Sequence, residues 1–219
     1  MSKNIEQQYQ DNQRALEEFQ KVWDGFSSQE KTSRRIEWAN RLERSLPHTS
    51  AALRNNVSNE ELEVAIRKDG LTEQLRYIQG IQDQATLILQ LLLEKGDPLS
   101  FVNMGEVWKP NQEDFERAFI EDAQRAYQTY SELWSTTPVA MPKDGQDKLL
   151  IQAATPKFIS EARFFPSGYA RCVHRFHPDT VWVSWKYVRD GQSNGMAYNG
   201  LAWLGDRFKW FPKPWRLWS

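Results

Sequence analysis

The sequence is poor in the side chains that form covalent cross-links and metal sites. Its 219 residues include one cysteine, Cys172, and three histidines. A single cysteine cannot form a disulfide within the chain, so nothing indicates an oxidising compartment, and a cytoplasmic location is expected. One thiol and few imidazoles are also too few for a zinc finger. We therefore expect no metal and no cofactor.

Long apolar runs and known catalytic motifs are absent as well. The longest apolar run surrounds Leu91–Leu93 and falls far short of the roughly 18 residues that a membrane span requires. The first residues are polar and lack the apolar core of a secretory signal. No Gly-rich phosphate loop, Cys-x-x-Cys, His-Glu-x-x-His or Gly-x-Ser-x-Gly occurs. The sequence thus favours a protein without a membrane partner and gives little support for an enzyme.

Aromatic residues, in contrast, are abundant and concentrated at one end. The chain is 40% hydrophobic and 13% aromatic, which provides enough apolar material for a sizeable core. Six of the ten tryptophans lie in the last 38 residues, interleaved with Arg and Lys. Tryptophan can bury a large area, stack on a flat ligand and donate one hydrogen bond. The cluster therefore predicts either an aromatic core or a binding face.

The net charge of −1 conceals an asymmetry between the two ends of the chain. Residues 1–150 carry 18 Lys and Arg against 25 Asp and Glu, whereas residues 151–219 carry 10 against 4. An anionic partner for the basic end is one interpretation. The interpretation we favour is that acidic helices and a basic sheet of the same protein attract each other.

The first 135 residues have the periodicity of amphipathic helices. Apolar residues recur at spacings of three, four or seven, which places them on one side of each helix. Ser58 followed by Glu61 has the form of a capping box, and prolines or glycines are expected to end the helices. The pattern predicts a bundle of about five helices, at 5–26, 28–46, 58–70, 72–95 and 111–134.

The residue pattern changes after residue 135. Prolines, threonines, Asp144 and Gly145 predict a linker over 136–157. Beyond it, short runs of aromatic and β-branched residues separated by turn residues predict an antiparallel meander of four to five strands over 158–219. The fold class is therefore α+β, with the helical bundle packed on the sheet as one domain or two. The strands are expected at 158–165, 169–176, 180–188, 197–204 and 207–211.

Alternation along these strands predicts which residues share a face. In the run 181–187, Trp185 and the other odd-numbered residues are expected in the core, whereas Trp182 and Lys186 point to the opposite face. If helices cover only one face, the other is basic and aromatic. The candidate partner-binding residues on that face are Trp182, Trp203, Arg171, Arg175, Lys186, Arg207 and Lys209.

One group of residues could serve catalysis. Cys172, His174 and Asp179 provide a thiol, an imidazole and a carboxylate within eight residues. Alternate residues of a strand lie about 6–7 Å apart, so the side chains would diverge instead of touching. We therefore regard them as weak catalytic candidates and expect a buried, inert cysteine.

The function best supported by these patterns is non-enzymatic binding through the basic aromatic face. The expected partner is an acidic protein or peptide, held by aromatic anchors and complementary charge. Two alternatives stay open. The sheet could form a pocket with the helices, as in a small-molecule-binding protein or a hydrolase-like enzyme, or the face could stack single-stranded nucleic acid. The oligomeric state stays undetermined.

Overall fold

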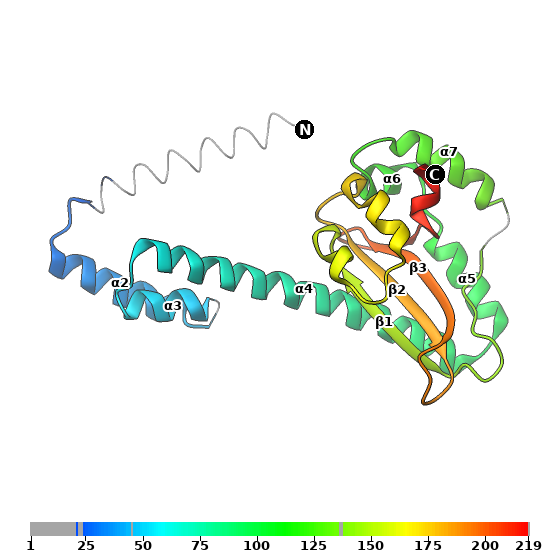
Figure 1. The fold of residues 1–219 in the computed structure, drawn as a ribbon, viewed down its shortest axis with the longest axis horizontal. Helices are drawn as coiled ribbons and strands as arrows, with labels where there is room; N and C mark the ends of the chain where they lie inside the picture. The colour runs from blue at the N-terminus through cyan, green and yellow to red at the C-terminus, as the bar shows by residue number, and fades with distance from the viewer. Residues whose placement is uncertain (1–20, 22–23, 45, 136–137, 219) are drawn as a thin grey trace. The chain divides into compact units, whose positions relative to one another are not determined.

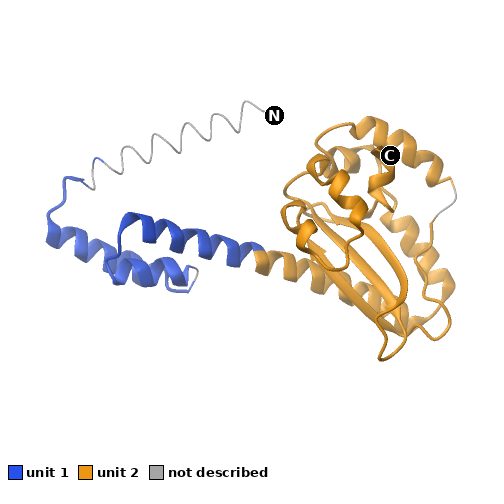
Figure 2. Ribbon diagram, in the orientation of Figure 1, with its two compact units in different colours: residues 1–74 blue, residues 75–219 orange. Residues whose placement is uncertain are grey.

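The computed structural model describes residues 21, 24–44, 46–135 and 138–218. The chain divides into two compact units, residues 1–74 and 75–219 (Figure 2). The fold is α+β, as the sequence predicts, with helices towards the N-terminus and an antiparallel sheet towards the C-terminus (Figure 1).

The first unit is helical. It contains α2 (Ser28–Leu42), α3 (Pro47–Arg54) and the beginning of α4 (Asn59–Lys95). The predicted helix over 28–46 is thus confirmed in its main part, while the one expected over 5–26 lies almost wholly outside the described residues. Pro47, expected only to end a helix, also begins α3, because proline suits the first helical position.

Buried hydrogen bonds hold α3 against α4. Asp69 of α4 is 2% exposed and accepts hydrogen bonds from the amides of His48 and Thr49, at 3.1 and 2.7 Å. These amides begin α3 and have no partner within the helix. Desolvation raises the pKa of Asp69, but the hydrogen bonds from Thr49 and His48 outweigh it and leave the pKa below its usual value. Asp69 thus replaces the side-chain cap that Leu46 cannot provide.

Helix α4 is continuous where the sequence suggested two helices. The predicted capping box is confirmed, since the Glu61 carboxylate accepts a hydrogen bond from the Ser58 amide at 3.0 Å. The predicted end at Gly70 is wrong, because this glycine does not adopt the left-handed conformation that closes a helix. Thr72, expected to cap a new helix, donates to the Lys68 carbonyl of the preceding turn, as threonine does inside helices.

Three shorter helices follow: α5 (Pro98–Trp108), α6 (Gln112–Ala118) and α7 (Ala123–Leu133). Asp97 caps α5 and Pro98 occupies its first turn, so the residues expected to stop α4 also begin a new helix. The single helix expected over 111–134 is interrupted between α6 and α7. There Phe119 forms a β-bridge with Phe176, and Asp122 adopts φ +59°. Pairing with a distant segment thus overrides the helical periodicity.

The sheet has four antiparallel strands in chain order, β1 (Lys148–Ala154), β2 (Val181–Val188), β3 (Gly195–Trp203) and β4 (Phe208–Trp210). The strands expected at 180–188, 197–204 and 207–211 are confirmed as β2, β3 and β4. Strand β1 lies in the segment expected to be a linker. The strands expected at 158–165 and 169–176 are wrong: these residues form the 3₁₀ helices η1 (Pro156–Glu161), η2 (Ser167–Arg171) and η3 (Val173–Arg175).

The 3₁₀ helices cover one end of the sheet face that was expected to be open (Figure 1). Trp182 lies there, completely buried, stacked on Phe176 with ring centroids 4.2 Å apart and in contact with Tyr169 and Phe119. The expectation that Trp182 faces outward is therefore wrong. On the other face Trp185, predicted to be core, is also fully buried and packs against Trp108 of α5.

A bulge at Gly200 shapes the C-terminal end of the sheet. The β2–β3 register shifts between Val183 and Ser184, so Gly200 is the extra residue, and it adopts φ +88°. A Cβ at this position would lie 1.9 Å from the carbonyl oxygen of Phe211. Only glycine therefore allows the chain after β4 to approach β3 so closely.

Gly200→Ala should destabilise the protein by about 3 kcal/mol or more, because it combines backbone strain with a backbone clash. Gly191→Ala is the matched control, since Gly191 also has positive φ but open space around it. We expect about 1 kcal/mol for this control. Thermal unfolding of both variants measures the difference. Equal losses would contradict the close approach of Phe211 to Gly200.

Candidate functional site

Two residues of the predicted basic face, Arg207 and Lys209, interact with a carboxylate of the protein itself, that of Asp114. Asp114 of α6 is completely buried, and its Oδ1 lies 2.8 Å from an Arg207 guanidinium nitrogen. Lys209 lies 3.8 Å from the other oxygen and donates to the carbonyls of Val107 and Lys109. The hydrogen bond to Asp114 raises the pKa of Arg207, opposed by partial desolvation. For these residues the structure bears out the attraction between acidic helices and a basic sheet.

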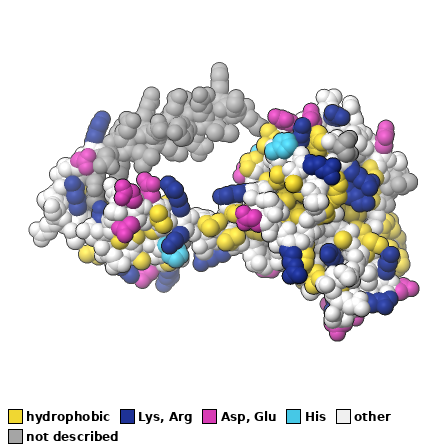
Figure 3. Space-filling model, in the orientation of Figure 1, with side chains coloured by type: hydrophobic (Ala, Val, Ile, Leu, Met, Phe, Trp, Pro, Cys, Tyr) yellow, Lys and Arg dark blue, Asp and Glu magenta, His cyan; other side chains and the backbone are white. Residues whose placement is uncertain are grey.

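The other predicted residues are dispersed over the fold. Arg175 pairs with Asp122 at 2.7 Å and lies over the Trp218 ring, and Lys186 lies over the ring of Phe164. Trp203 is half-buried and donates to the hydroxyl of Tyr77 at 3.1 Å. Arg171 is exposed. On the visible side of the second unit, residues 75–219, Lys and Arg side chains are interspersed with hydrophobic ones (Figure 3). These residues do not form one basic aromatic face.

The weak catalytic candidates are not brought together. Cys172 is completely buried, and its thiol lies 3.6 Å from the carbonyl oxygen of Tyr169. Burial raises the pKa of Cys172 to about 12, although Arg175 and Arg171 oppose the shift. His174 and Asp179 are exposed, and Asp179 faces His177 at 3.8 Å instead. Among the described residues, no hydrogen bond links the thiol to an imidazole.

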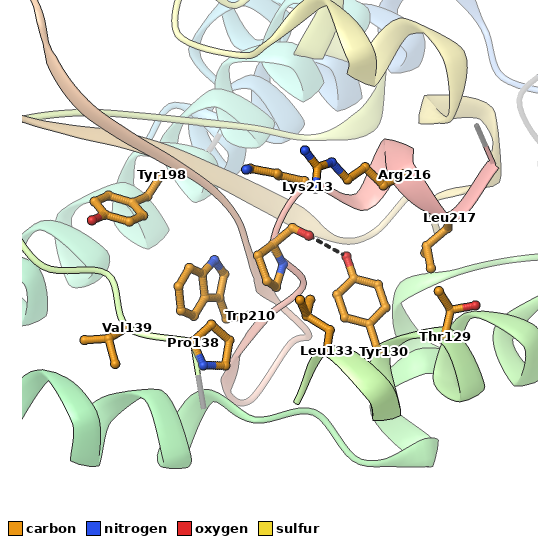
Figure 4. A pocket seen from close by; sticks show the side chains of 11 residues that line it. Thr129, Tyr130, Leu133, Pro138, Val139, Tyr198, Trp210, Lys213, Arg216 and Leu217 are labelled. Atoms are coloured by element: carbon orange, nitrogen blue, oxygen red, sulfur yellow. Dashed lines mark hydrogen bonds between the residues drawn. The ribbon is translucent and has the colours of Figure 1, made fainter. Parts of the chain in front are cut away.

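A groove of about 380 Å³ lies beside the C-terminal segment of the chain (Figure 4). Side chains of α7, β3, β4 and the segment after α7 form its apolar walls. Two cations, Lys213 and Arg216, lie in the same wall as Pro212. The remaining lining residues are Thr129, Tyr130, Leu133, Pro138, Val139, Tyr198, Trp210 and Leu217.

Hydrogen bonds between the segments around the groove hold it in shape. The Tyr130 hydroxyl donates to the Pro212 carbonyl at 2.9 Å (Figure 4), and Tyr198 donates to Met141 at 2.6 Å. The indole of Trp210 donates to the Asn199 carbonyl at 2.9 Å. These bonds connect α7 to the segment after β4, β3 to the segment after α7, and β4 to β3, so the walls of the groove are formed before any ligand binds.

The conformation of the C-terminal segment places the cations. Lys213 adopts φ +55°, and the 3₁₀ helix η4 (Pro214–Trp218) follows directly. The amide of Arg216 donates to the Lys213 carbonyl at 3.0 Å, so both residues belong to one turn. Trp215 packs on the backbone of Gly168, where a Cβ would lie 2.6 Å from the indole, and thereby anchors η4.

The electrostatics of the groove are positive. No Asp or Glu is among the described residues that line it. Burial raises the pKa of Tyr130 well above its usual value, with a smaller effect of Cys172, and burial also raises the pKa of Tyr198. Both tyrosines therefore stay neutral, and the charges at the groove come from Lys213 and Arg216. An apolar cavity with cations at one side suits a ligand that combines apolar and anionic groups.

Neither a metal-ligand cluster nor a membrane span is found in the described chain. No three His, Cys, Asp or Glu side chains gather there as potential metal ligands. None of its helices combines the length and apolar character needed to cross a bilayer. The chain gave no match in comparisons with protein-family models, curated proteins and solved structures. The groove is therefore the feature of this chain from which a function can be inferred.

Sequence reasoning did not identify this groove. Its cations lie in the segment Lys209–Arg216, which has the composition of an extended, proline-stiffened tail. The available signal was that Pro212 and Pro214 flank Lys213, because prolines on both sides restrict the backbone to a turn or an extended form. The lining residues of α7 were recognisable only as part of an amphipathic helix.

Arg207→Ala should lower the free energy of unfolding by about 1–3 kcal/mol, because it removes the main partner of a buried carboxylate. Arg171→Ala is the control and should change it by less than about 0.5 kcal/mol. In a double-mutant cycle, Asp114→Ala with Arg207→Ala should destabilise less than the sum of the two. Additive losses would show that the pair does not interact.

Cys172 should resist thiol reagents in the native state. With a pKa of about 12, only about 10⁻⁵ of the thiol is ionised at pH 7, compared with a few per cent for an unperturbed cysteine. Colour development with Ellman's reagent should appear only after denaturant is added, even at pH 9. Rapid labelling of the folded protein would contradict the burial of this thiol.

Proposed function

We propose that this chain is a non-enzymatic binding protein that recognises an acidic segment of a protein or peptide. The groove between α7 and the C-terminal segment takes an apolar side chain of the partner, and Lys213 and Arg216 interact with its carboxylates. The observation that carries this proposal is the apolar groove with cations and no carboxylate among its described lining residues.

The availability of Lys213 supports the choice of partner. Its side chain forms no ion pair with the described residues, whereas Arg207, Lys209 and Arg175 all face internal carboxylates. A cation without an internal partner can contribute its full charge to an incoming anion. Recognition through Lys213 therefore replaces recognition through the sheet face as the preferred hypothesis.

The size of the groove favours a side chain over a folded surface. A cavity of about 380 Å³ lies at the small end of the roughly 300–1,000 Å³ range typical of ligand sites. It can hold one or two apolar side chains, with the rest of the partner outside. A short segment with a Phe or Leu flanked by acidic residues matches these dimensions and this charge.

Fluorescence anisotropy with a pool of labelled heptapeptides, each with a central Phe or Leu flanked by Glu, tests the proposal. We expect saturable binding with a roughly micromolar dissociation constant. Lys213→Glu should weaken it by about tenfold, since it turns attraction into repulsion at the rim. Arg163→Glu makes the same charge change at an exposed position away from the groove and is the matched control.

Three results would count against the proposal. Equal affinity for peptides with Lys in place of Glu would remove the role of charge. Equal effects of Lys213→Glu and Arg163→Glu would remove the role of the groove. Stronger binding of a labelled oligothymidylate, falling steeply with salt, would favour single-stranded nucleic acid instead.

A further inference from the structure

We propose that the acidic segment binds in extended form, as an added strand along residues 195–199 of β3. Its backbone would pair with the free edge of β3 while an apolar side chain enters the groove. This inference rests on the proposed function, since it assigns the binding mode of the same site. In this binding mode the partner segment is an extended strand and not a helix.

The edge in question lacks a second strand. Apart from the bulge at Gly200, β3 pairs with β2 on one side from Gly195 to Trp203. On the other side β4 pairs only with Leu201–Trp203. In the part of the chain that the structure describes, residues 195–199 therefore have no strand partner on this side. Gly195 and Ala197 are exposed there.

The direction of the backbone groups follows from two hydrogen bonds. The Ser184 hydroxyl of β2 lies 3.2 Å from the Tyr198 carbonyl oxygen, so this carbonyl points towards β2. Neighbouring residues of a strand point their N–H and C=O groups to opposite sides. Those of Asn199 and Ala197 therefore point outward, and the Asn199 carbonyl indeed accepts a bond from Trp210 of β4.

Ala197 is the residue left without such a partner. Apart from its pairing with β2, Ala197 forms no backbone hydrogen bond with the described residues. An exposed strand edge with a free N–H and C=O is a template for another strand. The outward groups of Ala197 can therefore bind one residue of an incoming segment through two hydrogen bonds.

The chain after β4 leaves this edge for a local reason. The Phe211 amide donates to the Gly200 carbonyl at 2.7 Å, and the next residue is Pro212, whose fixed φ and missing N–H disfavour continuation of the strand. Lys213 then turns away with φ +55°, and its amide donates to the Asn199 side chain at 3.2 Å. As a result, the strand position that β4 would take if it continued is empty of described residues beside residues 195–199.

The free edge lies next to the groove and its cations. The backbone of Lys213 contacts the side chain of Asn199, and Ala197 is two residues, about 7 Å, further along the strand. Tyr198 and Trp210 line the groove from β3 and β4. A strand in the vacated position would place an apolar side chain in the groove. Its acidic residues would lie near Lys213 and Arg216.

Ala197→Pro tests the binding mode, since proline removes only an N–H that points away from β2. Proline is tolerated on edge strands in this orientation, so the thermal midpoint should stay close to that of the wild type. Affinity for the Glu-flanked heptapeptides should fall about tenfold or more. Ala197→Val keeps the N–H and should bind within about twofold of the wild type.

The failures of the two proposals are distinguishable. If the heptapeptides do not bind the wild type, the proposed function fails. If they bind and Ala197→Pro equals Ala197→Val, the groove is occupied without strand addition, and this inference is overturned. Dimerisation of the wild type without peptide, abolished by Ala197→Pro, would assign the edge to a second copy of the chain and overturn it as well.

Amide hydrogen exchange tests the same binding mode on the wild-type protein, so the result does not depend on whether a variant folds. Saturation with the heptapeptide should slow exchange of the Ala197 amide by about tenfold or more, because the amide gains a hydrogen bond. The amide of Arg163, which is exposed and away from the groove, is the internal reference. Unchanged exchange at Ala197 would overturn the inference.

Discussion

The covering of both sheet faces by aromatic side chains is the constraint on which the rest of this structure depends. Trp182 stacks on Phe176 at 4.2 Å under the 3₁₀ helices, and Trp185 packs against Trp108 on the opposite face. Burying such rings removes a large apolar area from water, about 150–250 Å² each. Because the tryptophans at the centre of both faces are covered, the sheet offers its ends and edges for recognition. The groove beside α7 and the open edge of β3 are features of this kind.

Charge is organised by the same constraint. Arg207, just before β4, and Lys209 of β4 extend to Asp114 of α6, and Arg175 extends from η3 to Asp122 before α7. The excess of basic residues after residue 150 thus serves partly to hold acidic helices against the sheet. Lys213 differs because its side chain forms no ion pair with the carboxylates of the described residues. Its position, more than the overall charge, indicates where an anionic partner would bind.

Much of the fold followed from the sequence because local patterns determined it. Alternation and turn residues predicted β2, β3 and β4, and the Ser58–Glu61 pair predicted the start of α4. The errors arose where distant contacts decide the conformation. The segment 169–176 is rich in aromatic residues, as strands are, but it curls into 3₁₀ helices because its rings pack on Trp182 and Trp215. The groove could not be predicted, since it joins residues from 129 to 217 that only the tertiary structure brings together.

Trp182, Trp185 and Trp210 belong to the core, and Trp210 also lines the proposed recognition site. Nuclear magnetic resonance of protein labelled with ¹⁵N-tryptophan tests this most directly, because each indole N–H gives a separate signal. On addition of the Glu-flanked heptapeptides, the account predicts a change in the Trp210 signal and none in those of Trp182 and Trp203. Changes at Trp182 or Trp203 with Trp210 unaffected would contradict it.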